Sequence, residues 1–309
     1  MRGTHGSIRR WRAVASALVL LGLAGASCGR TTGSTGGALR VVAAFYPIAF
    51  AAEQIGGPAV AVHDLTPAGA EPHDLELRPS DLARLRDAGV VLYLGGGFQP
   101  AVEDALKTRS DTKGLVDVLS GLPLHPGGGP ENLTFDPHVW LDPVLMRTIA
   151  DRIATALAAA RPSERTEFGR RVVDLDRRLT ALDGEYRRAL VGCKRHDVVT
   201  SHAAFGYLAA EYGLTQIAIT GLAPEAEPSP KRLAEVAKLA RDRGATTIFF
   251  ETLVSPRVAQ AVARTVGAET DVLDPIEGLT DAERKAGVDY FSIMRKNLAA
   301  IVRALGCGP

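Results

Sequence analysis

Three histidines and one aspartate occupy positions from which they could bind a metal ion together. His73 lies in EPHDLELRPSD, His138 in FDPHVWLDP, His202 in VVTSHAAFGYLAAEYGL and Asp274 in DVLDPIEGL. Each histidine lies where a predicted strand or loop gives way to a helix, and Asp274 ends a predicted strand. Because the carboxyl ends of parallel strands share one edge of a sheet, we expect these side chains to converge. Three imidazoles and one carboxylate form a ligand set for a transition metal.

The neighbours of two of these histidines favour a metal-binding role. His138 is bracketed by Asp136 and Asp142, whose carboxylates can hold an imidazole in one tautomer. His202 follows Ser201 near the start of a predicted helix, where the helix dipole favours a neutral ring. The remaining histidines lack such neighbours: His5, His63, His125 and His196.

Motifs of the common enzyme classes are absent from the sequence. It contains no HExxH, no Gly-x-Ser-x-Gly and no phosphate-binding loop. A three-histidine site with an open position could still activate water, with Glu71 or Glu251 as the base. A zinc-dependent metallohydrolase is therefore the enzyme alternative.

Composition limits the possible partners. The chain has 309 residues, 46% of them hydrophobic, which is enough for two domains with separate cores. Lys and Arg number 36 against 35 Asp and Glu, giving a net charge of +1. Such a chain has no basic field for a polyanion, so we expect no nucleic-acid partner, and we expect a monomer.

Residues 1–28 are typical of an export signal. Arginines precede the apolar run AVASALVLLGLAGA, which is shorter than the roughly 20 residues that span a bilayer. The run ends in Gly-Ala-Ser-Cys and resembles a bacterial lipoprotein box, in which Cys28 receives the lipid. A secretory signal with an incidental cysteine is the alternative. Residues 29–38, GRTTGSTGGA, predict a flexible tether.

Alternating strand and helix patterns predict an α/β fold with two Rossmann-like lobes. An N-terminal lobe is expected over 39–161 and a C-terminal lobe over 191–309, each with a parallel sheet covered by helices. Between them, 162–190 is highly charged, begins with a proline and predicts one long rigid helix joining the lobes.

Two cysteines fall in the last third of the chain. Cys193 and Cys307 would both be exported, and an oxidising compartment favours their pairing as a disulfide. Metal binding by Cys193 is the weaker alternative, because neither cysteine has a nearby thiol or histidine at zinc-finger spacing.

The motifs around the four candidate ligands resemble those of metal-binding lipoproteins of bacterial ABC importers, the cluster that delivers zinc or manganese. The resemblance covers essentially all of the exported chain. Its specific segments are GAEPHDLELRPSDLARL, FDPHVWLDP, TSHAAFGYLAAEYGL, GLAPEAEPSP and LDPIEGL.

This resemblance implies a non-enzymatic binding protein with the metal in the cleft between its lobes. The N-terminal lobe would supply His73 and His138, and the C-terminal lobe His202 and Asp274. It also implies an ABC permease as partner and a location outside the cytoplasmic membrane, anchored through Cys28 or periplasmic. A surface adhesin with structural zinc is a further alternative.

Zinc is the expected metal, and manganese the alternative. Manganese members of the family commonly have glutamate at the third ligand position, where this chain has His202. A three-imidazole shell suits zinc, whereas manganese prefers more oxygen ligands. The resemblance also allows Glu71 or water in place of the fourth ligand, Asp274.

Overall fold

The computed structural model describes residues 37–128 and 133–308. The compact body begins at Ala38. The predicted signal, Cys28 and almost all of the predicted tether lie outside the described residues. Among the residues that are described, no helix is both long and apolar enough to cross a membrane.

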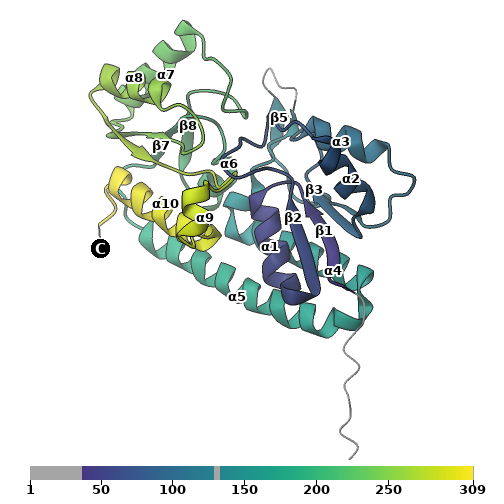
Figure 1. The fold of residues 1–309 in the computed structure, drawn as a ribbon. Coiled ribbons are helices and arrows are strands. Elements are labelled where there is room, and N and C mark those ends of the chain that lie inside the picture. Colours follow the sequence, from purple (N-terminus) through teal and green to yellow (C-terminus); the bar gives the residue numbers. More distant parts are fainter. Residues whose placement is uncertain (1–36, 129–132, 309) are drawn as a thin grey trace, which may run out of the picture. The chain divides into compact units, whose positions relative to one another are not determined.

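The N-terminal lobe contains a four-stranded parallel sheet with the order β2-β1-β3-β4 (Figure 1). Its central residues, such as Val41, Ala43 and Leu92, are buried, as expected for parallel strands covered on both faces. The strands are β1 (Leu39–Ala43), β2 (Val60–Asp64), β3 (Val90–Tyr93) and β4 (Leu115–Asp117). The helices are α1 (Tyr46–Gly56), η1 (Gly57–Ala59), α2 (Pro79–Asp87), α3 (Pro100–Lys107), η2 (Val139–Leu141) and α4 (Pro143–Ala160). An antiparallel pair, β5 (Pro126–Gly128) and β6 (Leu133–Phe135), precedes η2.

The C-terminal lobe repeats this architecture with a parallel sheet of order β10-β9-β7-β8. Its strands are β7 (Asp197–Thr200), β8 (Thr215–Ala218), β9 (Thr247–Phe250) and β10 (Glu269–Val272). Its helices are α6 (Gly206–Glu211), α7 (Pro230–Asp242), α8 (Arg257–Val266), α9 (Asp281–Lys285) and α10 (Tyr290–Leu305). His73 follows β2, His202 follows β7 and Asp274 follows β10, so these three lie after strands of the parallel sheets. His138 instead follows β6 of the antiparallel pair.

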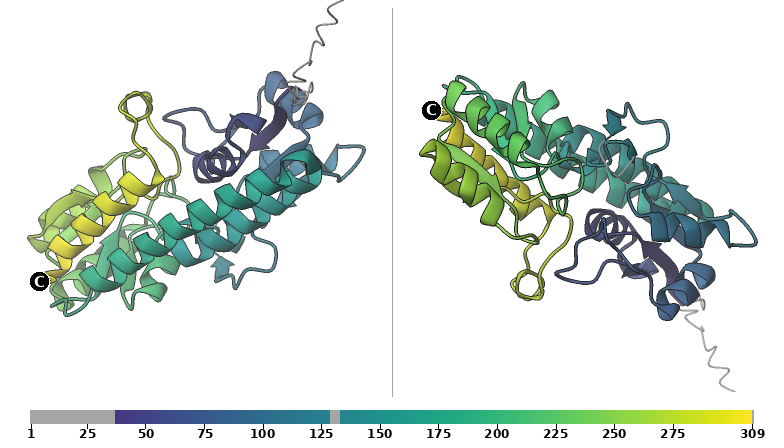
Figure 2. Two further views of the ribbon diagram at one scale, coloured as in Figure 1. Left: turned by 90° about the horizontal axis from the view of Figure 1, so that it is seen from below. Right: turned by 90° about the horizontal axis from the view of Figure 1, so that it is seen from above.

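A single long helix, α5 (Arg165–Ala189), follows the short helix η3 (Pro162–Glu164) and joins the lobes. It packs against α1 and α4 of the N-terminal lobe and against α10 of the C-terminal lobe (Figure 2). One face supplies its core contacts, at spacings of three and four residues. These buried side chains are Phe168, Val172, Leu175, Leu179, Leu182 and Tyr186. The predicted fold class, two α/β lobes joined by one long helix, is confirmed.

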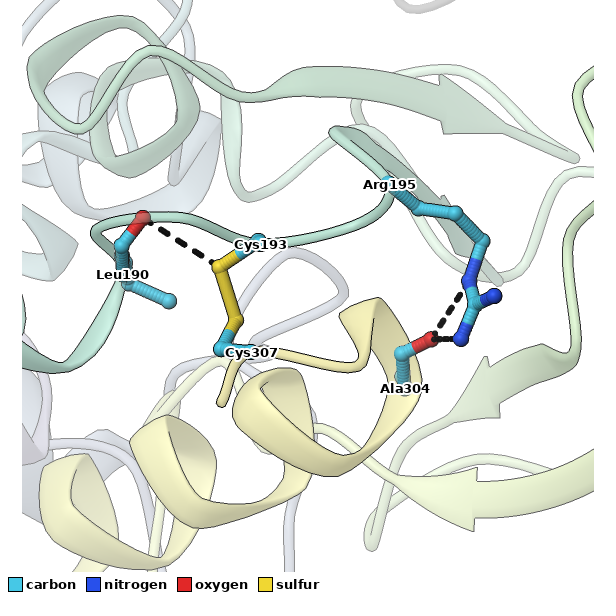
Figure 3. Close-up of a disulfide and its surroundings, with 5 residues drawn as sticks. All are labelled: Leu190, Cys193, Arg195, Ala304 and Cys307. Atoms are coloured by element: carbon cyan, nitrogen blue, oxygen red, sulfur yellow. Dashed lines mark hydrogen bonds between the residues drawn. A yellow bond between two sulfur atoms is a disulfide. The ribbon is translucent and has the colours of Figure 1, made fainter. Parts of the chain in front are cut away.

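The predicted disulfide is present between Cys193 and Cys307, which are 114 residues apart (Figure 3). Cys193 follows α5, and Cys307 follows α10. Beside it, the Arg195 guanidinium donates two hydrogen bonds of 3.0 and 2.9 Å to the carbonyl of Ala304. The bridge therefore fastens the last helix to the start of the C-terminal lobe.

Candidate metal centre

Four side chains from both lobes converge on one point: His73, His138, His202 and Glu277. Each offers one donor atom, and these atoms lie within 4.8 Å of one another. The Glu277 Oε1 atom lies 3.4 Å from Nε2 of His73, 3.2 Å from Nε2 of His138 and 3.4 Å from Nε2 of His202. The Nε2 atoms of His138 and His202 are 3.3 Å apart.

The four separations of 3.2–3.4 Å are close to the edges of a tetrahedral zinc site. Zinc binds histidine nitrogen and carboxylate oxygen at about 2.0–2.2 Å, so donors at the corners of a tetrahedron lie about 3.3–3.6 Å apart. Desolvation is nearly complete, since the exposed fractions of the side chains are 6% for His73, 0% for His138 and His202, and 1% for Glu277. The site therefore offers a cation four buried protein donors.

Asp136 fixes the ring of His138. Its Oδ1 lies 2.7 Å from Nδ1 of His138 and accepts the backbone N–H of the same residue at 3.0 Å. For Nε2 to face the metal, Nδ1 must carry the proton and donate it to this carboxylate. Burial alone would lower the pKa of His138, but the hydrogen bond and charge of Asp136 raise it. The predicted role of Asp136 is thus supported by the geometry, whereas Asp142 accepts the N–H of Val144 and caps α4.

Glu251 fixes the ring of His202 in the same way. Its Oε1 lies 2.6 Å from Nδ1 of His202 and also accepts the hydroxyl of Ser201. Glu251 directly follows β9, so its position comes from the parallel sheet. The proposed alternative role of Glu251 as a hydrolytic base conflicts with this contact, because the carboxylate faces the ring and not the centre of the cluster.

The prediction that a helix dipole keeps the His202 ring neutral was wrong. Helix α6 begins only at Gly206, so His202 lies in a turn four residues earlier and outside the reach of the helix dipole. Burial lowers the pKa of His202, but Glu251 and Glu277 outweigh it and raise the pKa well above its usual value. Without a cation, this ring is therefore readily protonated.

His73 is held by the loop between β2 and α2. Its backbone N–H donates to Oε2 of Glu71 at 2.9 Å, and burial lowers the pKa of its ring. Glu71 itself is outside the four-residue cluster. Its suggested role as the fourth ligand is therefore not supported by the geometry.

Asp274 is also outside the cluster, contrary to the sequence-based assignment. Its Oδ1 accepts the N–H of Ile276 at 2.7 Å, and its Oδ2 accepts the hydroxyl of Thr252 at 3.1 Å. The side chain of Asn297 bonds to its backbone N–H and carbonyl at 2.9 and 2.6 Å. Burial raises the pKa of Asp274 to about 7. Asp274 thus builds the turn that follows β10, and Glu277, three residues later, takes the fourth position.

Glu277 was missed because the sequence-based assignment selected the carboxylate at the end of the predicted strand, which is Asp274. The turn includes Ile276 at φ 59°, a left-handed conformation that redirects the chain toward the histidines. Burial would raise the pKa of Glu277, but the charge of His202 and hydrogen bonds from the three histidines hold it well below its usual value. The sequence did carry one signal against Asp274 as a ligand. Aspartate side chains in turns often accept hydrogen bonds from the backbone two residues on, and Asp274 precedes a proline.

Comparisons with known proteins identify relatives that are named for zinc. The zinc-binding lipoprotein AdcA of Streptococcus pneumoniae is 36% identical over 277 residues, which cover 86% of this chain and 55% of that protein. This chain therefore spans little more than half of that relative. The high-affinity zinc uptake system protein ZnuA of Bacillus subtilis is 33% identical over 91% of this chain and 93% of its own length.

A solved structure extends the likeness to three dimensions. The Zn(II)-bound ZnuA-like domain of Streptococcus pneumoniae AdcA matches with a TM-score of 0.77 and 36% identity, covering 87% of this chain and 99% of that domain. A family model described as the periplasmic component A of a zinc-uptake complex matches residues 41–304. The family consists of solute-binding proteins and not enzymes, so the prediction of a non-enzyme is confirmed. This chain belongs to the ZnuA family of periplasmic zinc-uptake components.

Proposed function

We propose that this chain captures zinc outside the cytoplasmic membrane and delivers it to the permease of an ABC importer. His73 and His138 from one lobe and His202 and Glu277 from the other would bind the ion together. The observation that carries the proposal is the convergence of these four buried donors, whose ligand atoms all lie within 4.8 Å of one another.

The donor set favours zinc over manganese. Three of the four donors are imidazole nitrogens, and one is a carboxylate oxygen. Manganese prefers an oxygen-rich octahedral shell, and zinc binds more tightly than manganese at a shared nitrogen-containing site. The related proteins in Streptococcus pneumoniae and Bacillus subtilis are named for zinc, which supports the same choice.

A hydrolytic zinc site would differ in its shell. Catalytic zinc keeps an open position for water, whereas structural and storage sites fill all four positions with protein donors. Here four protein donors would enclose the ion, and the two candidate bases, Glu71 and Glu251, accept hydrogen bonds from a backbone N–H and a histidine ring. This arrangement therefore favours a protein that binds zinc over one that uses zinc for hydrolysis.

We also propose that a lipid on Cys28 anchors the chain to the membrane. The support is the Gly-Ala-Ser-Cys segment after the apolar run and the name of the pneumococcal relative, a zinc-binding lipoprotein. Metabolic labelling with a fatty-acid analogue should mark the wild-type chain and leave Cys28→Ser unlabelled. Labelling of both proteins would refute the anchor.

Zinc uptake in the source cell tests the proposed function. Cells lacking this chain should accumulate radioactive zinc more slowly at limiting concentration. The wild-type copy should restore uptake, and a copy with both His138→Ala and Glu277→Ala should not. Normal zinc uptake in the deletion strain together with impaired manganese uptake would favour the manganese alternative.

A further inference from the structure

A glycine of the C-terminal lobe packs against the carboxylate that orients His138. Gly206 is the first residue of α6, and a Cβ atom placed on it would lie 2.9 Å from Oδ2 of Asp136. Real Cβ atoms essentially never approach another atom so closely. The φ angle of Gly206 is not among the positive values, so the backbone itself would accept alanine. Alanine at this position would therefore require the Asp136 carboxylate to shift, although the backbone conformation would accept it.

The carboxylate of Asp136 is held from both sides. Its Oδ1 contacts Nδ1 of His138 at 2.7 Å, and its Oδ2 lies against Gly206. Next to Gly206, the hydroxyl of Tyr207 donates to the carbonyl of Asp136 at 2.8 Å and accepts the N–H of His125 at 2.9 Å. The first turn of α6 thus packs across the lobe boundary onto the segment that holds an N-terminal ligand.

We propose that Gly206 is a positioning residue for zinc, acting through Asp136 on His138. The inference rests on the proposed function, because it takes His138 as a zinc ligand. Asp136 can reach the ring only while the start of α6 leaves room for its second oxygen. The C-terminal lobe therefore supplies two ligands directly and also sets the orientation of a third ligand from the opposite lobe.

Gly206→Ala tests this contact with a single methyl group. Loss of a partner that orients a metal-bound histidine typically costs 10- to 100-fold in metal affinity, so we expect zinc binding about tenfold weaker. Alanine has a higher helix propensity than glycine, so propensity alone predicts no loss of stability. Gly169→Ala on α5 is the matched control, since no atom lies within 4 Å of its added Cβ. It should leave zinc affinity unchanged.

A double-mutant cycle separates positioning from a general defect. In an Asp136→Ala background the added methyl meets no carboxylate, so Gly206→Ala should change zinc affinity less than about twofold. If Gly206→Ala alone does not fold, restored folding in the double variant supports the same contact. Tenfold weaker binding in both backgrounds, or failure of both variants to fold, would overturn the proposal.

The His138 ring provides a direct readout. In zinc-loaded protein with 15N-labelled histidine, the Nδ1–H resonance of His138 should shift in Gly206→Ala and stay in place in Gly169→Ala. An unshifted resonance with wild-type affinity would contradict the positioning role. Failure of the wild-type protein itself to bind zinc would instead refute the proposed function, so the two failures are distinguishable.

Discussion

Replacing Glu277 by glutamine should weaken zinc binding between about tenfold and a hundredfold. Glutamine keeps the size of the side chain and one weak oxygen donor but removes the negative charge. Glu277 Oε1 lies 3.2–3.4 Å from three imidazole nitrogens, so an ion bound by these rings would contact the carboxylate directly.

The magnitude follows from the number of ligands. Four-ligand structural zinc sites bind with about 10–16 kcal/mol, which is about 3 kcal/mol for each donor if they contribute equally. A loss of about 3 kcal/mol is roughly a hundredfold in affinity, and the amide oxygen of glutamine recovers part of it. The measurement is competition with a chromogenic zinc chelator at pH 8, where protons compete least for the histidines.

Asp274→Asn is the matched control for this prediction. Asparagine can still accept the N–H of Ile276, so the turn should persist and zinc affinity should change less than about threefold. A large loss in Asp274→Asn with little effect of Glu277→Gln would refute the assignment of the fourth ligand.

Three further predictions concern the histidines, the disulfide and pH. In zinc competition titrations, His125→Ala and His63→Ala should bind zinc like the wild type. Alanine at any ligand histidine should weaken zinc binding strongly. Equal losses of zinc affinity at all five positions would contradict the assignment of the ligands. Thiol labelling of the denatured, unreduced protein should find neither Cys193 nor Cys307 free, and replacing both by serine should lower the free energy of unfolding by up to about 5 kcal/mol in the chain-entropy model. Because its carboxylate neighbours raise the pKa of His202 well above its usual value, protons should compete with zinc at a higher pH than at an ordinary histidine. Zinc affinity should therefore fall as the pH is lowered from 8, and calorimetry in two buffers should detect the protons that zinc releases. A pH-independent affinity between pH 8 and 5.5 would refute that role of His202.

The architecture followed from patterns that the chain carries locally. Alternating apolar runs and helices with terminal glycines predicted both parallel sheets, and the proline-initiated charged stretch predicted α5 to within three residues at its start and one at its end. The three histidines could be found because each lies at a junction between regular elements, where parallel folds gather functional groups.

The identity of the fourth ligand depends on a local backbone conformation that the hydrophobic periodicity of the sequence does not predict. Asp274 and Glu277 are both carboxylates after the same strand, and only the turn through Ile276 decides which one faces the histidines. The contacts of Glu251 with His202 and of Gly206 with Asp136 join residues far apart in the chain. Such contacts arise when the chain packs, and no regular spacing in the sequence indicates them.

Anomalous diffraction at the zinc edge from crystals of the zinc-loaded protein would locate the ion. We predict a single strong peak within about 2.0–2.2 Å of Nε2 of His73, His138 and His202 and of a carboxylate oxygen of Glu277. A peak bound by Asp274 in place of Glu277, or zinc located outside this cluster, would contradict it.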